Sequence, residues 1–107
     1  MKTLTRKDEM MLLAVLRLGE EAALVALREL LNQHTGKPWS VGNVFVSLEK
    51  LEKLGYIDSS LGAPSARRGG RAVKFYTVNR VGLRALKEAR EMQDSLWEGL
   101  YDVIFNA

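Results

Sequence analysis

The sequence predicts a mainly α-helical fold with a small β component (α+β), and three observations indicate it. Between residues 6 and 54 the apolar residues recur at helical spacing in three segments. Two short segments, residues 56–61 and 71–78, are then rich in the residue types of β-strands. From residue 80 onwards helical spacing returns. A chain of 107 residues has the length of a single domain.

The first helix is expected over residues 6–18. Thr5 is suited to cap it, Asp8 supplies the acid of a short capping box, and Gly19 is suited to end it. The segment is apolar around much of its circumference, so both of its faces are expected to be covered.

A second helix is expected to begin at Glu20 and Glu21, because acidic side chains stabilise the positive end of a helix dipole. Gly36 ends it, and Pro38 prevents its continuation. Ser40 then caps a third helix that reaches Gly55, with apolar residues Val41, Val44, Phe45, Leu48, Leu51 and Leu54 along one face.

The two predicted strands are joined by residues 62–70, a connection longer than the usual hairpin loop. Asn79 is expected to cap one long last helix whose stripe runs through Leu83, Leu86, Ala89, Met92, Leu96, Leu100 and Val103. Three short helices followed by a hairpin indicate a winged helix-turn-helix. We divide it into a region of DNA-binding type over residues 1–78 and a dimerisation helix over residues 79–107.

Composition limits the other classes of function. The formal charge is +3, which by itself fits an ordinary protein surface. There is no cysteine, and the one histidine, His34, has no partner in a recognisable catalytic or zinc-binding motif. We therefore expect that the protein is not an enzyme and has neither a cofactor nor a metal site. The sequence has neither a signal-peptide pattern nor an apolar run of membrane-spanning length, which favours a cytoplasmic location.

The third helix has a second face that lies away from its apolar stripe. Small and polar residues near the start of a helix allow its close approach to the DNA major groove, and asparagine can pair with an adenine edge. Lysines further along would meet phosphates, although any surface helix can have a solvated face of this kind. The candidate DNA-binding residues of this helix are Ser40, Gly42, Asn43, Val46, Ser47, Lys50 and Lys53.

The connection between the strands concentrates positive charge. Arg67, Arg68, Arg71 and Lys74 lie within eight positions without an acidic residue among them, and Gly69 with Gly70 would allow the backbone close to a sugar-phosphate strand. This cluster favours contact with double-stranded DNA over a purely solubilising loop.

The last helix is longer than a three-helix core can cover, so we expect it to pair with a second copy of the chain. Folding back on its own core is the alternative. The candidate dimer residues are Met11, Val15, Leu86, Ala89, Met92, Leu96, Leu100 and Val103. Trp97 and Tyr101 are candidates either for packing at this interface or for binding a small aromatic effector.

Several motifs resemble the PadR family of bacterial regulators in its short form. They are LLAVLRLG at residues 12–19, LEKLEKLGYI at 48–57, LGAP at 61–64, RRGGRA at 67–72, FY at 75–76, VG at 81–82 and WEGL at 97–100. Phe45 stands where the family usually has tyrosine, and Ala23 with Leu24 where it usually has tyrosine and glycine.

The resemblance implies a homodimeric winged-helix repressor that binds a palindromic operator through its third helix and wing. Some members of the family respond to aromatic ligands held near the dimer interface, and Trp97 lies in a comparable region. The alternative is a winged-helix protein-interaction module that no longer binds DNA. The apolar Val46 and the altered Phe45 favour this alternative, whereas the positive charge of the connection opposes it.

Overall fold

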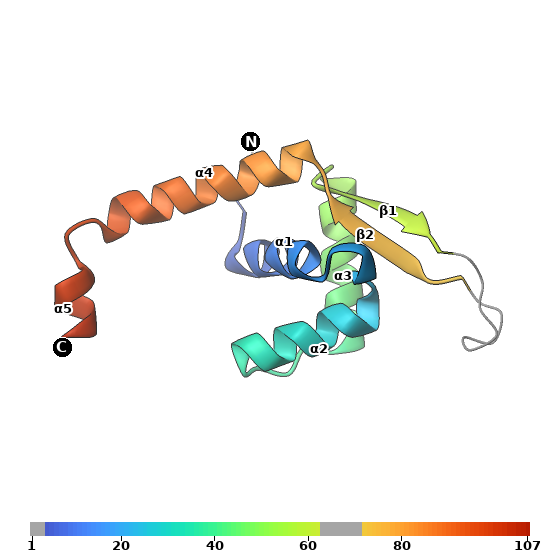
Figure 1. Ribbon diagram of the computed structural model, residues 1–107, viewed down its shortest axis with the longest axis horizontal. Coiled ribbons are helices and arrows are strands. Elements are labelled where there is room, and N and C mark those ends of the chain that lie inside the picture. The colour runs from blue at the N-terminus through green and yellow to red at the C-terminus, as the bar shows by residue number, and fades with distance from the viewer. Residues whose placement is uncertain (1–3, 63–71) are drawn as a thin grey trace.

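The computed structural model describes residues 4–62 and 72–107. Three helices, α1 (Arg6–Leu18), α2 (Leu24–Thr35) and α3 (Val41–Lys53), form the centre of the molecule. Strands β1 (Ile57–Leu61) and β2 (Lys74–Val78) form an antiparallel hairpin, the wing, and helices α4 (Arg80–Trp97) and α5 (Tyr101–Phe105) follow. The wing and α4 extend in opposite directions from the three-helix centre (Figure 1). This arrangement confirms the predicted winged-helix fold.

One core joins the three helices to the base of the wing. Met11 and Leu12 of α1, Leu27 of α2 and Leu48 of α3 are fully buried, and Ile57 at the start of β1 is almost completely buried against them. Burial of each such side chain contributes about 1.5–3 kcal/mol to folding, so these contacts fix the position of α3 relative to α1 and α2.

The predicted helix caps are confirmed. The hydroxyl of Thr5 accepts a hydrogen bond from the backbone N–H of Asp8, whose carboxylate accepts one from the N–H of Thr5. Ser40 accepts from the N–H of Asn43, and Asn79 accepts from the N–H of Gly82. Each cap satisfies a backbone donor that a helix end leaves free.

The prediction for the start of the second helix was wrong. Gly19–Glu21 form a short 3-10 turn (η1), and α2 begins only at Leu24. The intervening backbone is used by the wing, because the carbonyl of Ala22 accepts a hydrogen bond from the N–H of Tyr76 and Ala23 pairs with Phe75. This pairing requires an extended backbone at Ala23, which a helix starting at Glu20 would not provide.

The prediction of one continuous last helix was also wrong. The backbone at Glu98 leaves the helical conformation, with φ −54° and ψ 126°, and Gly99 has a φ of +80°, a left-handed conformation that favours glycine. Leu100 and Val103 therefore lie beyond the break, Leu100 as the residue before α5 and Val103 within it. Figure 1 shows α5 turned away from the direction of α4.

The wing strands are shorter than predicted, and their register runs from Ile57 opposite Val78 to Leu61 opposite Lys74. Residues 63–71 lie outside the described residues, and with them the predicted tip. No helix within residues 4–62 and 72–107 has the length and apolar character needed to cross a membrane.

Candidate nucleic-acid interface

The face of α3 opposite the core is exposed to solvent. Val44, Leu48 and Leu51 point into the core, which leaves Gly42, Asn43, Val46 and Lys53 on the exposed side. Val46 is 64% exposed. The side chain of Asn43 makes no hydrogen bond with another described residue, so its amide is available to an external partner. The first two turns of α3 thus present a small residue, a free amide and an apolar side chain on the exposed face.

Ser47 does not share this exposed face. Its hydroxyl oxygen is buried and has no hydrogen-bond partner within the described part of the chain. A hydroxyl in this position cannot reach the edge of a base without a change of rotamer. Ser47 is therefore not placed to contact bases as the sequence interpretation expected.

Lys50 is engaged by α1. Its Nζ lies 3.1 Å from Oδ2 and 3.3 Å from Oδ1 of Asp8, whose side chain is only 6% exposed. The sequence interpretation placed Lys50 at phosphates. In the structure the Lys50 ammonium group instead forms an ion pair with the buried Asp8 carboxylate, which would otherwise lack a compensating charge.

Lys74 is engaged on the other flank of α3. Its Nζ lies 3.3 Å from Oε1 of Glu52, while Oε2 of Glu52 accepts a hydrogen bond of 2.5 Å from the hydroxyl of Ser59. The Ser59 hydrogen bond, assisted by Lys74, holds the pKa of Glu52 below its ordinary value in spite of the opposing effect of desolvation. Ser59 of β1 and Lys74 of β2 thus both bind the Glu52 carboxylate of α3.

The sequence interpretation assigned no ion-pair partner to the acidic residues near α3. Asp8 and Glu52 pair with the predicted DNA-binding lysines, and Glu49 is exposed on α3. Glu49 and Glu52 alternate with Lys50 and Lys53 along α3, but both observed ion pairs join α3 to another element, so this alternation does not indicate them. The other predicted wing residues, Arg67, Arg68, Gly69, Gly70 and Arg71, lie outside the described residues.

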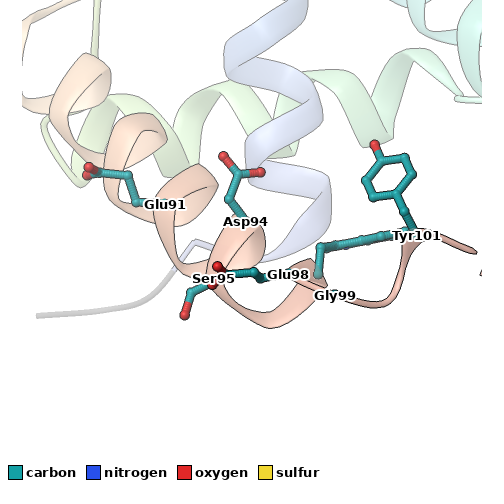
Figure 2. Close-up of a pocket in the computed structure, with 7 residues that line it drawn as sticks. Glu91, Asp94, Ser95, Glu98, Gly99 and Tyr101 are labelled. Atoms are coloured by element: carbon teal, nitrogen blue, oxygen red, sulfur yellow. The ribbon is translucent and has the colours of Figure 1, made fainter.

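At the far end of the molecule, aromatic rings gather around the break between α4 and α5. The rings of Trp97 and Tyr101 are 5.5 Å apart, and Phe105 stacks on both, at 6.0 Å from Trp97 and 4.9 Å from Tyr101. A hollow of about 540 Å³ adjoins them, lined by Glu91, Asp94, Ser95, Trp97, Glu98, Gly99 and Tyr101. Figure 2 shows Glu91 and Asp94 on α4, and Tyr101 beyond the break at Gly99.

The candidate dimer residues fall into two groups. Met11 and Val15 are 0% and 2% exposed because they belong to the core of the chain itself, and Ala89 is buried where α4 meets the remainder. These three residues offer no surface to a partner chain. Leu86 is partly buried on the same core, whereas Met92, Leu96, Leu100 and Val103 are exposed.

No family model matches the chain, and no curated protein matches it. Solved structures do match over most of its length. A PadR-like transcriptional regulator from Bacillus cereus shares 21% identity at a TM-score of 0.69, with 92% of this chain and 93% of that chain covered. The chain has the fold of PadR-like transcriptional regulators.

Two further solved structures have this fold, and each match extends over most of this chain and most of the matched chain. The PadR family transcriptional regulator from Eggerthella lenta shares 24% identity at a TM-score of 0.64, over 92% of this chain and 86% of that one. A transcriptional regulator from Clostridium thermocellum shares 14% identity at a TM-score of 0.69, over 95% and 99%. The PadR-like fold thus includes the wing and α4 together with the three-helix core.

Proposed function

We propose that the chain is a DNA-binding transcription regulator of the PadR type that reads its site with α3 and the wing. The observation that carries the proposal is the exposed face of the first half of α3, where Gly42, Asn43 and Val46 lie away from the core. The likeness of the whole chain to solved transcriptional regulators supports it.

The first turn of α3 is suited to the major groove. Gly42 places no side chain between the backbone and the bases. The Asn43 amide can donate one hydrogen bond to an adenine edge and accept another from it. Val46, one turn further on, can contact a thymine methyl group. Free N–H groups at the start of α3, next to Ser40, suit a phosphate, and Lys53 suits another.

The wing contributes charge by its sequence. Arg67, Arg68 and Arg71, together with the glycines between them, would bind phosphates or enter the minor groove beside the site of α3. In this proposal residues 1–78 bind DNA, and residues 79–107 join two copies of the chain in the cytoplasm.

A homodimer is supported by the apolar surface of the last two helices. Met92 and Leu96 of α4 and Val103 and Phe105 of α5 are exposed, and a monomer rarely leaves so many large apolar side chains together in water. Twofold symmetry would make the operator palindromic. Repression, and its release by an aromatic effector at Trp97 and Tyr101, are further parts of the proposal, supported by the aromatic cluster beside the hollow.

Selection of bound duplexes from a random pool tests the proposal. We expect an enriched motif with two inverted half-sites, and an affinity for it that falls steeply with salt because counterions are released from the phosphates. In the same selection Asn43→Ala should alter the preferred bases within each half-site. An unenriched pool, or binding that is flat between low and moderate salt, would refute DNA reading by this chain.

A second candidate is a winged-helix module that binds another protein. The ion pairs of Lys50 and Lys74 favour it, because they withdraw two of the predicted phosphate ligands from the interface. Retention on heparin separates the two candidates. A protein-interaction module is expected to elute at low salt, and a DNA-binding protein at high salt.

A further inference from the structure

Glu52 is placed where α3 meets both strands of the wing. Its Oε2 accepts from Ser59, which lies opposite Tyr76 in the strand register, and its Oε1 accepts from Lys74 at the outer end of β2. One carboxylate of the helix is therefore bonded to β1 and to β2 at the same time. The side chains of Ser59 and Lys74 contact Glu52 on the flank of α3, next to the exposed face of that helix.

Other contacts hold the wing from its base as far as Phe75, which pairs with Ala23. The N–H of Asn79 binds the carbonyl of Tyr56 at its base, and Tyr76 binds Ala22 on the side of α2. Lys74, in contrast, pairs with Leu61 at the outer end of the hairpin. These contacts join β2 to the segment before α2. The bond from Glu52 to Lys74 extends the restraint to the outer end of β2 and joins that end to α3.

Charge alone gives no reason for an acid at this place. A carboxylate near a DNA-binding face repels phosphates, and here it also neutralises Lys74. Glu49 provides a comparison on the same helix, since it is exposed and forms no ion pair within the described residues. What distinguishes Glu52 from Glu49 is its contact with the wing.

We propose that Glu52 is a positioning residue that holds the wing at a fixed angle to α3, so that both can contact one duplex. This inference rests on the proposed function. Ser59 and Lys74 are the wing side of the contact, and Lys74 acts through Glu52 rather than as a phosphate ligand. The lowered pKa of Glu52 agrees with a carboxylate that stays ionised at neutral pH and keeps both partners.

The test compares Glu52→Ala with Glu49→Ala on the selected operator. Each variant removes one negative charge from α3, so simple electrostatics predicts that both bind more tightly. We expect Glu49→Ala to bind as well as the wild type or up to about threefold more tightly, and Glu52→Ala to bind about three- to tenfold more weakly, since phosphate contacts of the wing are lost. Equal or tighter binding by Glu52→Ala would overturn the inference.

Hydroxyl-radical footprinting separates positioning from general loss of structure. Glu52→Ala is expected to lose protection at the flanks contacted by the wing and to keep protection in the centre of each half-site. Uniform weakening over the whole footprint would contradict the inference. If Glu52→Ala does not fold, Ser59→Ala replaces it, because this change leaves all charges in place and is expected to give the same loss at the flanks. Unchanged flanks in Ser59→Ala would then overturn the inference.

The two levels of the proposal fail differently. If the wild-type chain binds no duplex, the proposed function fails and the role of Glu52 fails with it. If the wild type binds its operator and Glu52→Ala behaves like Glu49→Ala, only the positioning role is refuted.

Discussion

Lys50 of α3 donates a hydrogen bond of 3.1 Å to Oδ2 of Asp8, the residue that also closes the capping box of α1. The carboxylate therefore joins α1 to α3 through two residues that are 42 positions apart in the sequence. We expect Asp8→Ala to lower the free energy of unfolding by about 2 kcal/mol, about 1 kcal/mol from the cap and the rest from the bond to Lys50. Denaturation in urea measures this.

Thr5→Ala is the matched control for that prediction. It removes the hydroxyl of the same capping box and leaves Asp8 paired with Lys50, so its expected cost is about 1 kcal/mol. Equal losses in Thr5→Ala and Asp8→Ala would show that the bond to Lys50 contributes nothing to stability.

The sequence contains enough information for the features of the fold that depend on near neighbours. Caps such as Thr5, Ser40 and Asn79 act over three residues, and they marked the starts of α1, α3 and α4 correctly. The extended backbone at Ala23 could not be predicted in this way, because its cause is pairing with Phe75, 52 positions later.

The same difference between local and distant causes applies to the candidate site. Helical spacing was enough to place Asn43 and Val46 on the exposed face of α3. It could not show that Lys50 turns to Asp8, since a pattern of charges does not reveal which helices become neighbours. The break at Gly99 has a different cause. The apolar residues keep their helical spacing on both sides of Gly99, so the spacing alone predicts an unbroken helix.

Gly82 allows α4 to approach the base of the wing closely. A Cβ atom at this position would lie 2.3 Å from the carbonyl oxygen of Tyr56 and 2.7 Å from Cγ1 of Val78. We expect Gly82→Ala to destabilise the fold by about 1–3 kcal/mol, since backbone must move to accept it. Thermal unfolding provides the measurement.

Gly42→Ala is the control for Gly82→Ala, because the Cβ of an alanine at position 42 meets only Ser40 Oγ, at 3.9 Å. Its stability should be unchanged or higher by up to about 1 kcal/mol, the helix propensity of alanine over glycine. A Gly82→Ala protein as stable as Gly42→Ala would contradict the close approach.

The ion pair of Glu52 predicts a pH dependence of stability. Because Ser59 and Lys74 hold the pKa of this carboxyl below its value of 4.5 in the unfolded chain, the ionised form stabilises the folded state. This contribution is complete above pH 4.5 and is lost as the pH falls through the lower pKa of the folded protein. Glu52→Gln should therefore be less stable than the wild type at pH 7, and the difference should shrink below pH 4.5.

Urea unfolding of both proteins at several pH values measures that difference. Glu49→Gln is the control, since it makes the same chemical change on α3 at a side chain without an ion pair in the described residues. A gap between Glu52→Gln and the wild type that stays constant from pH 7 to pH 3 would exclude the contribution of the ionised carboxylate.

Leu96 provides the sharpest test of the homodimer, because its side chain is 68% exposed on α4 and outside the core of the chain. Leu96→Glu places a charge where the proposed interface excludes water, so we expect monomers and the loss of tight operator binding. Ser95→Glu adds the same charge at the adjacent exposed position, about 100° around the helix, and should remain dimeric. Analytical ultracentrifugation distinguishes the two. A dimer of Leu96→Glu as stable as that of Ser95→Glu would place the interface elsewhere, because a buried glutamate without a partner cannot be tolerated at an apolar contact.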